Sequence, residues 1–137
     1  MALPVIDTNI LVRYLTKDEP VQSPKAQAYI DQLDQGTLQA TSCEGVLVET
    51  VQVLSSKNLY NLPRTLIAQY LTGFLSLKGL KMHNKRTYLR ALALYETTNI
   101  SFVDALTIAH SEREGSHTVI SFDKGLDKVG GISRQEP

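Results

Sequence analysis

The sequence predicts an α/β fold, because short apolar segments typical of strands alternate with longer segments whose apolar residues recur at helical spacing. Such an alternation is typical of a parallel sheet covered by helices on both faces. The length of 137 residues and the apolar content of 42% suit one domain with one buried core. We therefore expect residues 1–137 to form a single α/β domain with a central, mostly parallel sheet.

The first third of the chain contains two predicted strands and two predicted helices. Residues 3–6 are short, apolar and partly β-branched, which suits a buried strand. Apolar residues at helical spacing over 10–15 predict a helix, which the prolines that follow interrupt. A second helix is expected over 23–33, and residues 38–40 are expected to form a short strand.

The segment 46–54 is ambiguous, because its β-branched residues favour a strand whereas its apolar spacing favours a helix. The preceding residues Thr41–Glu44 have the pattern of a capping box. We therefore expect a helix over 46–54.

The rest of the chain repeats the alternation. In order, we expect a helix from Pro63 to before Gly79, a strand over 80–82, a helix over 85–97, a helix from Ser101 to before Gly115, and a strand over 118–122.

The composition excludes several classes of protein. No apolar run approaches the roughly 20 residues that a membrane span needs, and the first residues do not resemble a signal peptide. The only cysteine, Cys43, cannot form an internal disulfide, and no Cys/His cluster offers a zinc site. We therefore expect a soluble, cytoplasmic protein without a membrane partner.

The net charge of zero conceals an uneven distribution along the chain. Residues 1–49 carry a net charge of −4, residues 50–95 carry +7 without a single acid, and residues 96–137 carry −3. A basic middle segment suits a phosphate backbone, although solvated helix faces would give the same pattern.

Four acids stand among apolar neighbours, where carboxylates are rare unless they are paired or bound. Asp7 and Asp123 end predicted strands, Glu49 lies within 46–54, and Asp104 lies near the start of a predicted helix. Each has an ordinary interpretation: a helix cap, a turn, a first-turn acid or a solvated face.

Together, the four acids favour a more specific interpretation. Ligands of open parallel sheets bind at the carboxyl ends of the strands, where Asp7 and Asp123 are expected, and helices beside that edge would bring in Glu49 and Asp104. Two like charges 4 Å apart repel by about 4 kcal/mol at an effective dielectric of 20, so such a cluster needs protons or a cation. Oxygen ligands without Cys or His favour Mg²⁺ or Mn²⁺, and a site of this kind suits phosphodiester cleavage.

The segments around these acids resemble the motifs of PIN domains, in order and in spacing, over about residues 3–129. The start of the chain is most similar to the VapC-like toxins of bacterial and archaeal toxin–antitoxin pairs. The segments that carry the resemblance are Val5–Asn9, Val46–Glu49, Phe102–Ala105 and Ser121–Asp123.

The resemblance implies a Rossmann-like three-layer α/β/α sandwich and a metal-dependent ribonuclease. It also implies an RNA substrate, a homodimer and a cognate antitoxin that blocks the site. Asp7, Glu49, Asp104 and Asp123 match the family's acidic quartet, which holds the metal and serves catalysis. Asn9 matches a polar residue that orients the first acid, and Ser121 matches a hydroxyl position two residues before the last acid.

One position departs from the family pattern, because many relatives carry another Asp where this chain has Gly125. Asp127 follows two residues later, and the sequence leaves open whether it substitutes or is a surface residue. The candidates for guiding RNA are Arg13, Lys81, Lys85 and Arg86.

Three alternatives accompany an Mg²⁺-dependent toxin endoribonuclease. A PIN nuclease could process RNA or DNA without an antitoxin, and a catalytically inactive PIN module could only bind partners; the intact quartet argues against the latter. A phospho-receiver domain has a similar length and α/β pattern, but it needs an adjacent acidic pair after its first strand. Asp7 is flanked by Ile6 and Thr8, which argues against that fold.

Overall fold

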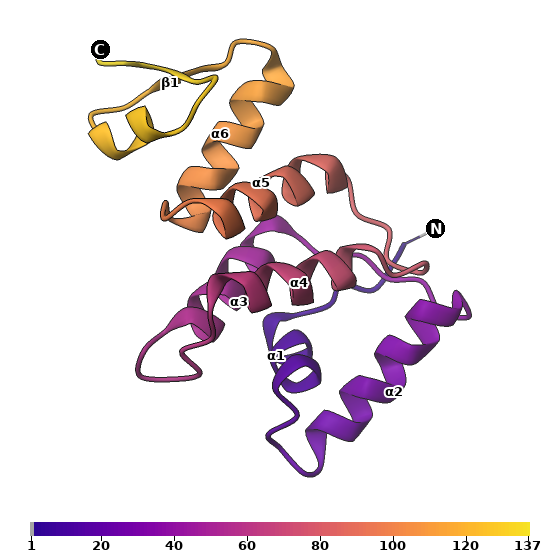
Figure 1. Cartoon of the computed structure of the whole chain (residues 1–137). Coiled ribbons are helices and arrows are strands. Elements are labelled where there is room, and N and C mark those ends of the chain that lie inside the picture. Colours follow the sequence, from indigo (N-terminus) through magenta and orange to yellow (C-terminus); the bar gives the residue numbers. More distant parts are fainter. Residues whose placement is uncertain (1) are drawn as a thin grey trace. The chain divides into compact units, whose positions relative to one another are not determined.

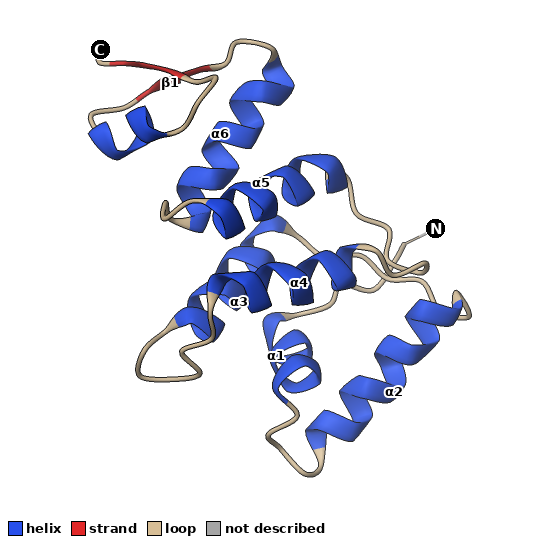
Figure 2. Cartoon of the chain, viewed as in Figure 1, coloured by secondary structure: helices blue, strands red, loops and turns tan. Residues whose placement is uncertain are grey.

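Helices account for most of residues 2–137, which are the residues that the computed structural model describes (Figure 2). The chain divides into a first unit, which ends at His83, and a second unit, Asn84–Pro137 (Figure 1). None of the helices described over residues 2–137 is long and apolar enough to cross a membrane.

Over residues 2–83, the first unit contains four helices, each of which turns an apolar face inward. The fully buried side chains include Leu11, Leu33, Leu47 and Phe74, one from each helix. Helix α1 packs against α2 and α3, and α3 packs against α4. The helices are α1 (Thr8–Thr16), α2 (Gln22–Gln35), α3 (Glu44–Ser55) and α4 (Arg64–Leu75).

Three short segments of the first unit pair in parallel. Val5 bridges Thr41, and Ala40 bridges Leu80. The Thr41 carbonyl accepts from the Ile6 amide at 2.9 Å, and the Ala40 carbonyl accepts from the Lys81 amide at 2.8 Å. The segments predicted as strands over 3–6, 38–40 and 80–82 thus run parallel as expected, but each neighbouring pair is joined by only a single bridge.

The ambiguous segment 46–54 is helical, as predicted, and lies within α3. The predicted capping box is wrong, because the N-cap is Cys43 and its side chain accepts no capping bond. Thr41 is used in the parallel pairing, and the Ser42 hydroxyl donates to the Ile6 carbonyl at 2.9 Å. These two hydroxyl residues therefore tie the start of α3 to the segment before α1.

The second unit contains two packed helices followed by a small parallel sheet. Tyr95 and Phe102 meet edge to face, with ring centroids 5.9 Å apart. Helix α5 packs on α6, α6 contacts β1, and β2 contacts η1. The elements are α5 (Lys85–Thr97), α6 (Phe102–Glu114), β1 (Thr118–Ile120), the 3₁₀ helix η1 (Lys124–Lys128) and β2 (Ser133–Gln135).

The predicted strand over 118–122 is too long, because β1 ends at Ile120. The Ser121 amide still donates to the Gln135 carbonyl, but Phe122 is 71% exposed and the chain turns at Asp123 into η1. Strand β2 was not predicted. It pairs in parallel with β1, with Val119 opposite Arg134.

Candidate functional site

Asp7 stands where the first paired segment meets α1. Its backbone is extended, and its Oδ1 accepts from the Thr8 amide at 2.8 Å, so it is the N-cap of α1. Ile6 and Thr8 on either side are buried, whereas Asp7 is exposed. The cap uses one carboxylate oxygen and leaves Oδ2 without a partner among residues 2–137.

Glu49 lies on α3, opposite the buried face that Val46, Leu47 and Thr50 form. Its side chain is exposed and has no hydrogen bond or ion pair among residues 2–137. Asp7 and Glu49 both lie in the first unit, in which α3 packs against α1.

Asp104 lies in the first turn of α6, where the helix dipole favours a negative charge. The Ser101 hydroxyl accepts from the Asp104 amide at 3.0 Å and caps the helix. Asp104 is partly buried, and its carboxylate has no partner in the described part of the chain.

Asp123 is held in the turn between β1 and η1. Its amide donates to the Ser121 hydroxyl at 2.9 Å, and its Oδ1 accepts from the Gly125 amide at 2.8 Å. A Cβ at Gly125 would lie 3.0 Å from that Oδ1, so the absence of a side chain there gives the Asp123 carboxylate room. The Ser121 hydroxyl, which was predicted to support the last acid, thus accepts a hydrogen bond from the backbone amide of that acid.

Asp127 forms a two-pronged ion pair, which the sequence did not reveal. Its two oxygens accept from Nε and Nη2 of Arg134 at 2.9 and 3.3 Å, and Arg134 Nη1 donates to the Ser121 carbonyl at 3.0 Å. The hydrogen bonds from Arg134 lower the pKa of the Asp127 carboxyl. No sequence signal pointed to Arg134, because it lies in the strand that was not predicted.

The four quartet acids divide between the units, with Asp7 and Glu49 in the first and Asp104 and Asp123 in the second. Over residues 2–137, neither unit by itself groups three His, Cys, Asp or Glu side chains as a metal site would. The donor chemistry of the quartet nevertheless fits a hard cation. Each acid keeps at least one carboxylate oxygen without a protein partner in the described chain, and none pairs there with Lys or Arg.

The remaining predicted residues lie in different surroundings. Asn9 is exposed and lines a pocket of about 510 Å³ beside α1 and α2. Arg13 is occupied by Gln22 and Asp18, whose oxygens lie 3.0 and 3.2 Å from its guanidinium nitrogens. The other three candidates for RNA binding are Lys81 and Arg86, which are exposed, and Lys85, which is partly buried.

Comparison with known proteins identifies one family. A search of curated proteins finds no match. The family described as PIN domain matches residues 5–132, a range that contains all four quartet acids and the parallel bridges of the first unit. PIN domains have an α/β fold and are generally metal-dependent nucleases, so the fold class predicted from the sequence is confirmed. Because the match covers nearly the whole chain, this protein belongs to the PIN-domain family.

Proposed function

We propose that this protein is an Mg²⁺-dependent endoribonuclease, for which Mn²⁺ can substitute, with Asp7, Glu49, Asp104 and Asp123 as its metal ligands. One observation carries the proposal: the PIN match runs from residue 5 to residue 132 and includes all four acids. Their unpaired carboxylate oxygens support it, because a carboxylate already neutralised by Lys or Arg would be a poorer ligand.

Backbone amides hold the side chains of two of the four proposed ligands. The Thr8 amide restricts the Asp7 carboxylate, and the Gly125 amide restricts that of Asp123. Such supporting bonds limit the conformers that a ligand samples before the cation binds. When bound, the cation lowers the pKa of a water and stabilises charge on the leaving oxygen of a phosphodiester.

We further propose that the nuclease is a homodimeric toxin with a cognate antitoxin. The pocket beside α1 and α2 supports a protein partner, because exposed apolar side chains, Val5 and Ile10, line it together with Tyr29. Lys25, which has no ion pair among residues 2–137, also lines it, and this charge suits a partner segment that carries an acid next to apolar residues.

Cleavage of a defined RNA tests the nuclease. Asp7→Asn and Asp104→Asn should each lower the cleavage rate by at least about 100-fold, because each removes a charged metal ligand. The matched control is Asp34→Asn, since Asp34 is exposed on α2 and has no hydrogen bond or ion pair among residues 2–137. Equal rates for Asp104→Asn, Asp34→Asn and the wild type would contradict the proposal.

The ends of the products test the chemistry. Attack by a metal-activated water leaves a 5′-phosphate and a 3′-hydroxyl and does not use the ribose 2′-hydroxyl as nucleophile. Mass spectrometry of the products should show these ends, and cleavage should persist when the 2′-hydroxyl at the cut site is replaced by hydrogen. A 2′,3′-cyclic phosphate as the main product would rule out this mechanism.

Growth of a bacterial host tests the toxin. Induced wild-type protein should arrest growth, whereas Asp104→Asn should not. Co-expression of the proposed antitoxin, to be sought as a small protein encoded next to this gene, should restore growth and inhibit cleavage by the purified protein. Growth arrest by Asp104→Asn that equals wild type would show that the effect is not enzymatic.

A further inference from the structure

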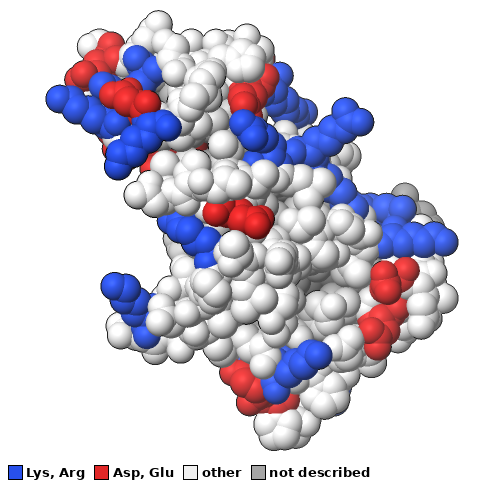
Figure 3. Space-filling model, in the orientation of Figure 1, with Lys and Arg blue, Asp and Glu red and all other residues white. Residues whose placement is uncertain are grey.

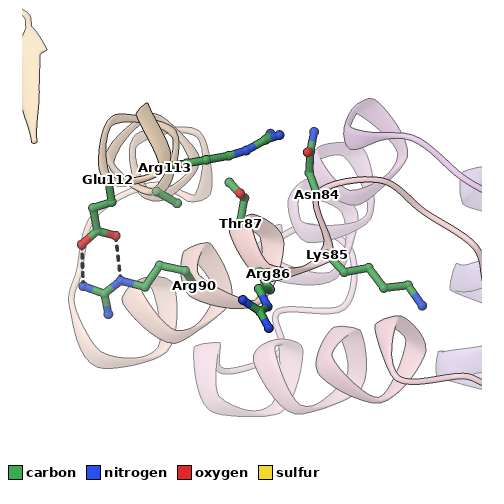
Figure 4. A pocket seen from close by; sticks show the side chains of 8 residues that line it. Asn84, Lys85, Arg86, Thr87, Arg90, Glu112 and Arg113 are labelled. Atoms are coloured by element: carbon green, nitrogen blue, oxygen red, sulfur yellow. Dashed lines mark hydrogen bonds and ion pairs between the residues drawn. The ribbon is translucent and has the colours of Figure 1, made fainter. Parts of the chain in front are cut away.

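The second unit contains a pocket of about 560 Å³ between the start of α5 and the end of α6. Asn84, Thr87 and Arg113 line it, together with Arg90 and Glu112 (Figure 4). We call it the anion pocket. Figure 3 shows that Lys and Arg side chains gather over this part of α5 and α6.

Thr87 is the most informative residue of the anion pocket. It is only 6% exposed, yet its hydroxyl has no hydrogen-bond partner among residues 2–137. In Figure 4 the polar ends of Thr87, Arg113 and Asn84 point toward one another across the hollow. No side-chain nitrogen or oxygen among residues 2–137 is both fully buried and unpartnered, so the Thr87 hydroxyl reaches the surface of the pocket, where a ligand can share a hydrogen bond with it.

The charges of the anion pocket favour an anion. Arg90 donates to both oxygens of Glu112, at 2.8 and 3.1 Å, so the only acid that lines the pocket is already neutralised. The guanidinium of Arg113 has no acidic partner among residues 2–137. Its planar fork of donors matches the geometry of phosphate oxygens.

The start of α5 adds positive potential to the same pocket. Asn84 has a left-handed backbone, with φ of 65°, and its side chain does not cap the helix. The first turn contains Lys85 and Arg86 and no acid, although the helix dipole favours acids at that end. An anion in the pocket would relieve this imbalance, as anions at helix N-termini commonly do.

We propose that the anion pocket binds a backbone phosphate of the nucleic-acid substrate. Thr87 Oγ1, the Asn84 amide group and the Arg113 guanidinium would be its hydrogen-bond donors. The proposal rests on the proposed nuclease function and deepens it. Arg113 lies nine residues from Asp104 on α6, which corresponds to about 13 Å along the helix axis. The bound phosphate is therefore not the scissile one, and the pocket contributes to affinity rather than to chemistry.

Binding of a single-stranded RNA in EDTA, followed by fluorescence anisotropy over a range of salt concentrations, tests the proposal. Arg113→Ala should weaken binding roughly tenfold and reduce the slope of log K against log salt by about 0.7. Thr87→Val keeps the shape and removes the hydroxyl, and it should weaken binding by about threefold. In cleavage assays both variants should raise KM and leave kcat unchanged.

The matched control is Lys57→Ala, which removes the same charge from an exposed turn of the first unit and should leave RNA affinity near wild type. The proposed phosphate site would be overturned if Arg113→Ala kept the wild-type affinity and salt slope while the wild-type protein binds and cleaves RNA. That result would leave the proposed nuclease function standing. Failure of the wild-type protein to bind RNA would instead contradict the proposed function.

A second arm distinguishes a backbone phosphate from a free one. Thermal unfolding is followed with added inorganic phosphate at constant ionic strength, for the wild type and for Arg113→Ala. Loss of phosphate stabilisation together with loss of RNA affinity supports the proposal. Loss of phosphate stabilisation alone would show a site for free phosphate and would overturn the proposal.

Discussion

At the scale of single residues, Arg134 occupies both carboxylate oxygens of Asp127. Arg134 is only 11% exposed at its side chain and joins Asp127 to the Ser121 carbonyl. The Ser121 hydroxyl in turn accepts from the Asp123 amide. We therefore assign Asp127 and Arg134 to positioning the turn that carries Asp123.

A double-mutant cycle checks this assignment. Arg134→Ala should lower the cleavage rate at least as much as Asp127→Ala, because it also removes the bond to the Ser121 carbonyl and the ion pair with Glu136. The double variant should lower the rate no further than Arg134→Ala, because the contact with Asp127 is already lost. Neither should change the apparent Mg²⁺ affinity as much as Glu49→Gln does. A loss of Mg²⁺ affinity confined to Asp127→Ala would identify Asp127 as a ligand instead.

Asp18 provides a pH-dependent contact at the same scale. Its carboxylate accepts from the Tyr60 hydroxyl at 2.5 Å and the Thr16 hydroxyl at 2.7 Å, and these bonds, with Arg13, lower the pKa of Asp18. Because the pKa is lower in the folded state, the contribution to stability is present above the unfolded value of about 3.9 and is lost as the pH falls through the folded pKa.

Substitution of the tyrosine checks this contact. Tyr60→Phe should raise the pKa of Asp18 toward the ordinary value, because it removes the strongest hydrogen bond to the charged form. Carboxyl chemical shifts in an NMR titration measure the change. Tyr70→Phe is the control and should leave the titration of Asp18 unchanged, whereas an unchanged Asp18 in Tyr60→Phe would show that the bond is not formed in solution.

At the scale of elements, the turn between α4 and the third paired segment depends on Gly79. A Cβ at this position would lie 2.1 Å from the Leu38 carbonyl oxygen and 2.9 Å from the Leu33 carbonyl oxygen. The Gly79 amide donates to Leu33 at 2.7 Å, and its carbonyl accepts from Ala40 at 3.0 Å. These two hydrogen bonds hold the backbone at Gly79 in place, so it cannot move away to accommodate an added side chain.

Gly79→Ala should lower the free energy of unfolding by about 2 kcal/mol or more, since overpacking against backbone is not relieved by a rotamer change. The control is Gly73→Ala, where a Cβ meets nothing within 4 Å on helix α4. That substitution should raise stability by roughly 0.5–1 kcal/mol. Urea unfolding measures both, and equal midpoints for the two variants would contradict the close packing at Gly79.

At the scale of the whole molecule, the proposed metal ligands couple ion binding to folding. A cation that binds only the folded protein stabilises it by mass action, by about 2.7 kcal/mol at a hundredfold excess over Kd. Millimolar Mg²⁺ or Mn²⁺ should therefore raise the Tm of metal-free protein. The shift should shrink in Glu49→Gln and persist in Glu114→Gln, which changes an exposed glutamate without a partner among residues 2–137.

The metal-free variants give the complementary result. Asp7→Asn and Asp104→Asn remove one charge from the proposed ligand set, so their Tm without metal should equal or exceed that of the wild type. A Tm far below wild type would show that the carboxylate is structural, which for Asp7 would mean that its cap of α1 outweighs any repulsion.

Local patterns in the sequence were sufficient for the helices. Apolar spacing predicted α5 over 85–97 and the helical state of α3, because helical periodicity is encoded within a few turns of chain. The capping box before α3 failed for the opposite reason. Thr41 is engaged by a segment more than thirty residues away, and no local pattern records that competition.

The sequence by itself determined the α/β class, the helices and the four motifs that the PIN match spans, because period, caps and motif spacing are local properties. Only the tertiary structure decided that Asp127 pairs with Arg134, that β2 lies parallel to β1, and that Thr87 turns an unpartnered hydroxyl into a pocket with Arg113. Each of these depends on which side chains meet after the chain has turned. These contacts depend on packing and hydrogen bonding between distant segments, and neither produces a periodic pattern in the sequence.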